Sequence, residues 1–533
     1  MAIFDYLRET ILGLGKQLKW SYLPPLMVYV AAGVAGFTGI VGTFFIKEYL
    51  DLSAALLAGL GFWAGLPWAL KMPLGHIVDL VWKHKNYLVY CGASIITSSL
   101  LIMYGLIAHT STMANFLSVE TWFVLSVILT PVGYVIQDVV ADAMTVEAVP
   151  LEDKNGQKFS PKVIKEMHMT MQTLGRFAII GGTVFVGLIN VILFQGVETL
   201  SEKEKIQLYA SIYLWALIIP LISVLGVFLA NNQRHKSNLV KNNRRLSDNN
   251  LEERPEVNWT ILLGSLIFVL FSLGVGLFNF QFSKEIVFFG SVIIILFLMG
   301  KLVKELPESQ RLMIVGTAII IFVFRAVPNP GPGLSWFEID ELGFNEQFFS
   351  ILSLLSSILT LLGIILLRPY IVKNSIARVI VVLSIAGSIL FLPSIGMYYG
   401  FHNWTASITT GIVDAKFIAI INTALESPLG QVAMIPLLAW IAKNAPSNMK
   451  ATFFAVFASF TNIALSASAL LTQYLNEIFI VTREIKNKVT SEIISTADYS
   501  ELGLLLIAVT IITLVLPIGA IYLIQRSRFQ TTD

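Results

Sequence analysis

Three carboxylates stand within an otherwise apolar stretch of the sequence, Gln137-Asp-Val-Val-Ala-Asp-Ala-Met-Thr-Val-Glu147. Residues 121–149, which contain this run, read as a membrane-spanning helix. A charged group at the centre of such a helix costs about 2.5 to 3.5 kcal/mol, so it generally belongs to a substrate path, a proton relay or a structural charge pair. Asp138 and Asp142 are four residues apart and share one helix face. Two carboxylates that close in a low dielectric do not both ionise easily, which makes both candidates for proton coupling.

A cation for these acids stands in the next apolar segment of the sequence. Arg176 has a depth that matches that of Asp138 if both helices meet the loop 150–165 at the same membrane face. Two interpretations stay open. The acids change protonation during function, or they form a fixed network with Arg176 that holds two helices together. Arg176 itself either binds an anion or only neutralises Asp138 or Asp142.

Two further acids have different expected roles. Glu147 lies near the end of its helix and is a candidate for a gate or cap. Glu426 lies well inside a later apolar span, 414–442, with no basic residue nearby in sequence. It is therefore either protonated or paired across the molecule with Lys71 or Arg325, and it is another proton-coupling candidate.

The composition is that of an integral membrane protein. Of the 533 residues, 56% are hydrophobic and only 13% are charged, whereas soluble domains average about 25% charged residues. The 36 basic residues nearly balance the 34 acidic ones, so nothing indicates nucleic acid as a partner. The single cysteine, Cys91, excludes an internal disulfide. The histidines lack the spacing of a metal site, and we expect neither a metal nor a cofactor.

Fourteen segments are apolar and long enough to cross about 30 Å of hydrocarbon. They fall into groups of six, two and six: 22–46, 53–79, 87–108, 121–149, 167–194 and 207–230; then 259–280 and 285–303; then 312–328, 346–367, 375–399, 414–442, 449–476 and 502–525. The predicted fold class is all-α, with two six-helix bundles and two extra transmembrane helices between them.

Charge and composition divide the chain into five parts. They are an amphipathic segment 1–20, a six-helix bundle 21–230, a basic cytoplasmic linker 231–258, the extra helix pair 259–310 and a second bundle 311–533. Lys and Arg gather in the linker and in loop 150–165, while loop 329–345 has acids and no Lys or Arg. By the positive-inside rule both termini are cytoplasmic. We expect a multi-pass monomer in the plasma or inner membrane, with lipid, a small solute and protons as its partners.

Two six-helix bundles joined by a long basic linker form the layout of a secondary transporter, which binds its substrate between the bundles. A local motif agrees with this layout. Between the second and third spans stands Gly75-His-Ile-Val-Asp79-Leu-Val-Trp-Lys83-His-Lys85, which resembles the inner-loop signature of the major facilitator superfamily. The resemblance implies that Gly75, Asp79 and Lys83 belong to a cytoplasmic gate. The alternative is that Asp79 only ends a helix and the lysines only set topology.

Longer motifs resemble one family within that superfamily, the folate-biopterin transporters. The motifs are Leu66-Pro-Trp-Ala-Leu-Lys71-Met-Pro-Leu-Gly75, the run from Gln137 to Glu147, Asp340-Glu-Leu-Gly343-Phe, Leu429-Gly-Gln-Val-Ala-Met-Ile-Pro436 and Ala451-Thr-Phe-Phe-Ala455. The resemblance spans residues 20–480. Two features depart from the family's pattern: the extra helix pair, and Asn422, which stands where we would expect an acid.

The resemblance implies transport of folates, pterins or related solutes, coupled to a proton gradient. Such solutes are anions with a flat heterocycle, so their site requires a cation, hydrogen-bonding amides and an aromatic face. The candidates for substrate binding are Lys71, Arg176 and Arg325 as buried cations, Asn422 and Gln431 as amides, and Trp68 as an aromatic platform.

Other functions are weighed against this one. The sequence has no nucleotide-binding glycine-rich motif ahead of a Lys-Ser/Thr pair, which disfavours an ATP-driven pump. The alternatives are a carrier of a different solute, such as an amino acid, a nucleoside-like metabolite or an organic-acid chelator, and a non-transporting receptor or scaffold. Charges kept within the membrane argue against a scaffold, which gains little from their insertion cost. The extra helices either contact a partner or lipid, or keep the two bundles in register, and we expect the latter.

Overall fold

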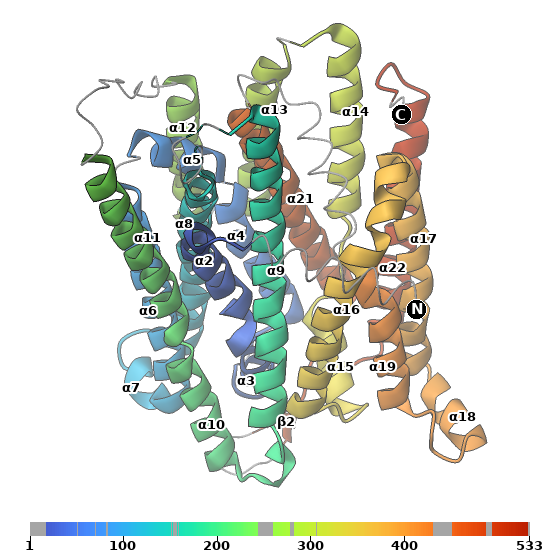
Figure 1. The fold of residues 1–533 in the computed structure, drawn as a ribbon. Helices are drawn as coiled ribbons and strands as arrows, with labels where there is room; N and C mark the ends of the chain where they lie inside the picture. The colour runs from blue at the N-terminus through green and yellow to red at the C-terminus, as the bar shows by residue number, and fades with distance from the viewer. Residues whose placement is uncertain are drawn as a thin grey trace, which may run out of the picture.

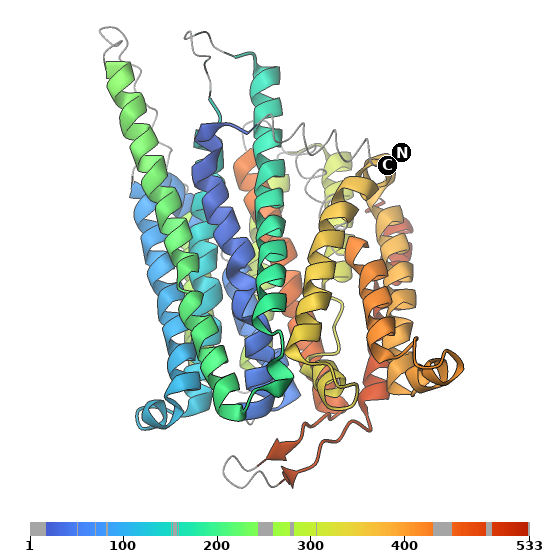
Figure 2. The same ribbon diagram turned by 60° about the horizontal axis from the view of Figure 1, so that its bottom comes forward.

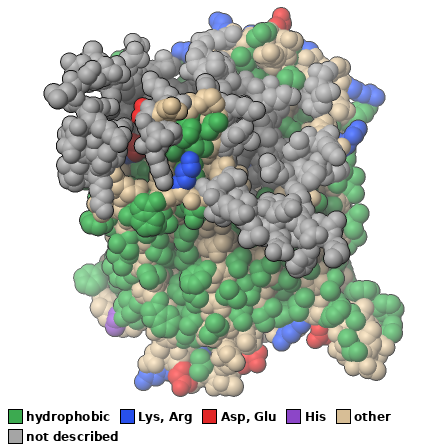
Figure 3. Space-filling model, viewed as in Figure 1, with side chains coloured by type: hydrophobic (Ala, Val, Ile, Leu, Met, Phe, Trp, Pro, Cys, Tyr) green, Lys and Arg blue, Asp and Glu red, His purple; other side chains and the backbone are tan. Residues whose placement is uncertain are grey.

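The apolar runs of the sequence form long helices. In hydrocarbon the backbone N–H and C=O groups find no water, and a helix satisfies them internally. The structure is a computed structural model that describes residues 18–50, 52–69, 71–81, 84–150, 152, 157, 159–242, 259–277, 282–304, 306–429, 450–486 and 493–530. The described residues include nine helices long and apolar enough to cross a membrane. Figure 3 shows the resulting apolar belt between two ends that carry charged side chains.

The first group of helices extends from Trp20 to Asn242, and a 3-10 turn joins α2 to α3 as one span. Its members are α2 (Leu23–Val34), α3 (Gly39–Tyr49), α4 (Ala54–Ala69), α5 (Lys71–Leu80), α6 (Asn86–Ala108), α7 (Thr110–Ala114), α8 (Val119–Ala148), α9 (Pro161–Leu193), α10 (Glu202–Trp215) and α11 (Ile218–Asn242). Local signals set their starts. The Ser160 side chain accepts a hydrogen bond from the Val163 N–H, and Pro161 occupies the first turn of α9, where it sacrifices no hydrogen bond.

The extra pair and the second group follow. They are α12 (Trp259–Leu277), α13 (Ser283–Val303), α14 (Glu308–Arg325), α15 (Pro332–Asp340), α16 (Glu346–Lys373), α17 (Ile376–Tyr398), α18 (Phe401–Ile408), α19 (Ala415–Glu426), α21 (Lys450–Ile478) and α22 (Leu502–Gln525). The strands β1 (Ile485–Lys486) and β2 (Ile493–Ser495) pair antiparallel between α21 and α22. Each predicted span contains one or two of these helices.

The two groups of helices lie side by side (Figure 1). Figure 2 shows β1 and β2 projecting from one end of the molecule, while α11 extends from the other. We call these the hairpin end and the linker end. By the charge pattern, the hairpin end is expected to face outside.

The extra helices contact both groups. α12 packs against α5, and α13 packs against α21. α4 and α21 contact each other directly, and side chains of α13 such as Val287 and Ile295 join the same buried apolar cluster. The Lys284 ammonium also donates a 2.7 Å hydrogen bond to the Gln473 Oε1 of α21. The pair therefore covers the seam between α4 and α21.

Two glycines allow α2 and α9 to touch backbone to backbone. A Cβ at Gly182 would lie 2.9 Å from the carbonyl carbon of Gly33, whereas one at Gly181 would have nothing within 4 Å. We expect Gly182→Ala to lower the free energy of unfolding by about 1 to 3 kcal/mol, because overpacking shifts a rigid backbone. Gly181→Ala is the matched control and should be neutral or slightly stabilising, because alanine favours helix. Thermal unfolding of both purified variants tests this, and equal melting temperatures would contradict it.

Several sequence expectations need correction or lie outside the described residues. α11 continues to Asn242, into the segment that we expected to be linker, because its polar end remains compatible with a helix. The short helices α7, α15 and α18 and the β1–β2 hairpin occupy segments that we took as plain loops. The predicted amphipathic segment and the remainder of the linker, 1–17 and 243–258, lie outside the described residues.

Candidate functional site

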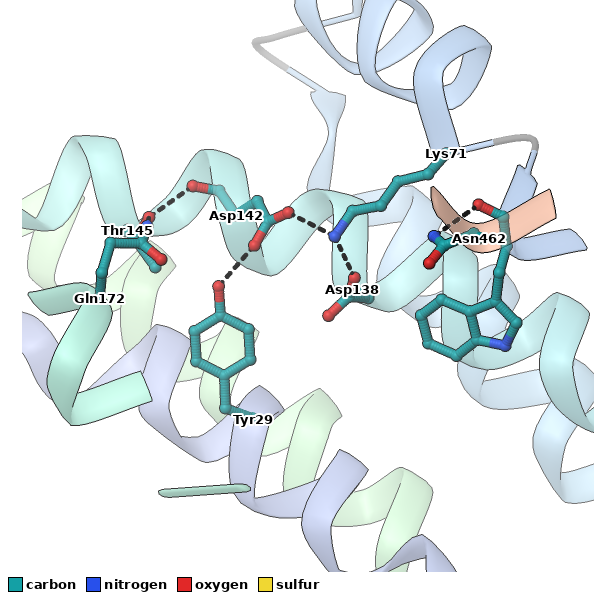
Figure 4. Close-up of polar contacts among 8 residues, drawn as sticks. Tyr29, Lys71, Asp138, Asp142, Thr145, Gln172 and Asn462 are labelled. Atoms are coloured by element: carbon teal, nitrogen blue, oxygen red, sulfur yellow. Dashed lines mark hydrogen bonds and ion pairs between the residues drawn. The ribbon is translucent and has the colours of Figure 1, made fainter. Parts of the chain in front are cut away.

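Lys71 bridges the two acids of α8. Its Nζ lies 2.6 Å from Oδ2 of Asp138 and 2.8 Å from Oδ2 of Asp142. The Tyr29 hydroxyl of α2 donates to the other oxygen of Asp142 at 2.6 Å. Figure 4 shows these four side chains converging from three helices. The arrangement joins α2, α5 and α8 through one ammonium and two carboxylates.

The local helix geometry explains this convergence. The acids are four residues apart, so α8 presents both on one face, and Lys71 stands at the start of α5 beside that face. The side chains of Lys71 and Asp138 are 22% and 16% exposed, while that of Asp142 is 43% exposed. Asp138 is therefore the more enclosed carboxylate, and Asp142 is the one that solvent reaches more easily.

A small cavity adjoins Asp138. Its volume is about 130 Å³, and its lining residues are Val28, Tyr29, Ala32, Ala35, Trp68, Tyr134, Gln137 and Asp138. Drug-sized ligands occupy roughly 300 to 1,000 Å³, so this cavity is large enough for one ring system only. Three aromatic side chains, one amide and one carboxylate in such a space suit a flat group with hydrogen-bond donors.

Arg176 is not the partner that we expected for these acids. Its side chain is exposed, and among the described residues no acid lies within ion-pair distance of it. Lys71 takes that place because the start of α5 lies against α8. Arg176 still acts on Asp138 electrostatically, so it is a cation near the cluster and outside it.

The remaining predicted site residues lie apart from this cluster. Glu426 ends α19 with an exposed side chain, and Lys71, one of its two expected partners, is bound elsewhere. Arg325 is half-buried at the end of α14, where a cation offsets the helix dipole. The buried Oδ1 of Asn422 has no hydrogen-bond partner among the described residues. Gln431 lies outside the described residues.

The predicted gate is only partly described. Glu147 pairs with Lys85, whose Nζ lies 2.5 Å from Oε1, so this acid links the ends of α8 and α6 within one helix group. Gly75 lies in α5, whereas the side chain of Asp79 and all of Lys83 lie outside the description. The gate therefore stays a prediction. No three His, Cys, Asp or Glu side chains among the described residues gather as a metal site requires.

Two contributors escaped the sequence analysis. Tyr29 carries no signal in its own span, where it is one apolar-looking residue among many. Asn462 of α21 donates a 3.1 Å hydrogen bond to the Trp68 carbonyl, three residues before Lys71, and so connects the second helix group to the site (Figure 4). Its sequence offers one weak signal: Asn462 is an amide within the apolar span of α21.

Solved structures of membrane transporters share this architecture. The nucleoside transporter NupG aligns over 95% of this chain and 100% of its own, with 12% identity and a TM-score of 0.52. The POT family transporter PepTSo aligns over 97% and 100%, with 13% identity and a TM-score of 0.59. At such identities the likeness establishes the fold alone: this is a helical membrane protein with the major facilitator fold.

The sequence comparisons define the family. The model of the BT1 family matches residues 32–532. A folate-biopterin transporter from a Synechocystis strain is 23% identical over 479 residues, which cover 88% of this chain and 78% of the relative. The chain therefore belongs to the BT1 family and is a multi-pass membrane transporter, not an enzyme. The predicted resemblance to the folate-biopterin transporters is confirmed.

Proposed function

We propose that this transporter is a secondary active carrier that imports or exports a folate- or pterin-like solute by alternating access, coupled to protons. The observation that carries the proposal is the Lys71 bridge between Asp138 and Asp142, beside a cavity with aromatic walls. BT1 membership and the name of the Synechocystis relative support the substrate class. The fold supports movement of two helix groups about a central site.

Charge balance gives a physical route to coupling. One ammonium and two carboxylates carry a net charge of −1, which repels an anionic solute in a low dielectric. Binding one proton makes the cluster neutral and leaves Lys71 with a single charged partner. The anion then meets Arg176 without facing an excess negative charge on the cluster. Proton and anion therefore favour each other's binding, which is the requirement for symport.

In this proposal the ring of the solute occupies the cavity beside Asp138. Trp68, Tyr29 and Tyr134 offer faces for stacking, and Asp138 accepts hydrogen bonds from ring N–H groups. The acidic tail of a folate exceeds this volume and would extend toward Arg176. The predicted amides Asn422 and Gln431 remain candidates for contacts from the second helix group.

Uptake into proteoliposomes tests the proposal. With an inward proton gradient, labelled folate or biopterin should accumulate above equilibrium, and a protonophore should abolish the accumulation. Liposomes without protein and liposomes without a gradient are the controls. Uptake that ignores the gradient would contradict proton coupling. If amino acids, nucleosides or organic-acid chelators are transported and no pterin compound is, the proposed substrate class would be wrong.

A further inference from the structure

The end of α3 at the hairpin end is bound by separate segments of the second helix group. The buried Lys47 ammonium forms an ion pair with Asp340 at the end of α15. The Tyr499 hydroxyl, just before α22, donates a 2.5 Å hydrogen bond to the other oxygen of Asp340. Burial and this hydrogen bond raise the pKa of Tyr499, so its hydroxyl remains a donor at physiological pH. One carboxylate thus connects α3, α15 and the start of α22.

Arg483 contacts the same helix end from a third segment, between α21 and α22. Its guanidinium is buried, with 5% of the residue exposed. One terminal nitrogen donates to the Lys47 carbonyl and the other to the Leu50 carbonyl. The last carbonyls of a helix lack intrahelical donors and carry its negative dipole end. A guanidinium satisfies both needs, because its N–H groups form a rigid fork with a permanent charge.

An apolar layer packs beside these polar contacts. Trp336, Phe337 and Val481 of the second group pack with Ala54 at the start of α4. The Arg483 guanidinium lies 6.0 Å from the centre of the Trp336 ring. Lys47 is buried, so loss of Asp340 would leave its ammonium without a compensating charge, which is costly inside a protein.

From this geometry we infer that Lys47, Asp340 and Arg483 form a clamp that closes the transport path at the hairpin end. α3 belongs to the first helix group, and Asp340 and Arg483 belong to the second. Opening this end requires the two groups to separate, which must break the ion pair and withdraw Arg483 from the carbonyls. The clamp therefore sets how often the hairpin end opens, and its residues position the helices for transport without contacting the site around Lys71.

Thiol labelling tests the clamp directly. In a Cys91→Ser background, Leu57→Cys introduces a single thiol in α4, where Leu57 packs against the apolar layer at this end. Its reaction with a membrane-impermeant maleimide reports opening. We expect Asp340→Asn and Arg483→Gln each to accelerate labelling about tenfold. The first leaves the buried Lys47 ammonium without its counter-charge, and the second leaves two carbonyls at the helix end without their donors. Glu341→Gln is the matched control: its side chain is exposed, it follows Asp340 directly, and the labelling rate should not change.

Two more variants keep the test decisive. If Asp340→Asn does not yield folded protein, Arg483→Lys retains the charge but loses the fork, and it should still accelerate labelling. The exchange Lys47→Asp with Asp340→Lys should restore slow labelling toward that of the parent. Equal labelling rates in the parent and in all folded clamp variants would overturn the inference. The assay needs neither substrate nor a proton gradient, so its failure is distinct from failure of the proposed function.

Discussion

Asp138→Asn should abolish proton-driven accumulation of the solute while exchange of internal for external solute continues. An amide has nearly the shape of the carboxylate but cannot take up a proton. The cluster would then stay neutral, with Lys71 paired to Asp142 alone, which is the state that admits an anion. Uptake against a gradient and counterflow, measured on the same proteoliposomes, separate the two activities.

A matched control lies on the same helix. Glu120 stands in the first turn of α8 with an exposed side chain, so Glu120→Gln should leave accumulation unchanged. If accumulation survives in Asp138→Asn, the coupling proton must bind another residue, and Asp142 and Glu426 become the candidates. Loss of folded protein in Asp138→Asn would show instead that the ion pair with Lys71 is chiefly structural.

Lys71→Met should be the most destabilising single change in the site. It removes the only cation within ion-pair distance of either acid among the described residues. Breaking a buried ion pair by deleting one partner costs about 3 kcal/mol or more, because the other charge stays behind without compensation. The double variant Lys71→Met with Asp138→Asn should recover much of this loss, since only Asp142 then remains charged and it is the more exposed acid.

Thermal unfolding of the parent, the two single variants and the double variant completes a thermodynamic cycle. Strictly additive effects would mean that Lys71 and Asp138 contribute independently to stability, which would contradict an energetically significant ion pair between them. Lys71→Arg serves as a control, because it keeps the charge while it alters the geometry.

Hydropathy alone located the long apolar helices, since the need to satisfy backbone groups in lipid leaves a spanning segment few alternatives. The shared face of Asp138 and Asp142 also followed from helical periodicity. The predicted ion-pair partner of these acids was wrong, because depth in the membrane does not determine which way a side chain points around its helix. Arg176 has a suitable depth in sequence, yet rotation about the axis of α9 leaves its side chain exposed, and tertiary packing brings Lys71 to the acids instead.

Contacts between distant segments had no sequence signal of comparable strength. Tyr29 reaches Asp142 from a span that reads as uniformly apolar, and Arg483 reaches α3 from a loop far along the chain. Loop residues of this kind follow no hydrophobic period, so the hydrophobic pattern of the sequence did not predict α15 or the β1–β2 hairpin.

The extra helix pair also affects how this protein meets the bilayer. Because α12 and α13 cover the seam between α4 and α21, acyl chains along that flank contact continuous helix surface. Where α13 meets α21, the polar side chains of Lys284 and Gln473 are hydrogen-bonded to each other, which lowers the cost of placing them beside hydrocarbon. Among the described residues the extra pair thus gives this flank of the transporter a cover of its own, and we expect the two flanks to differ in their sensitivity to membrane composition.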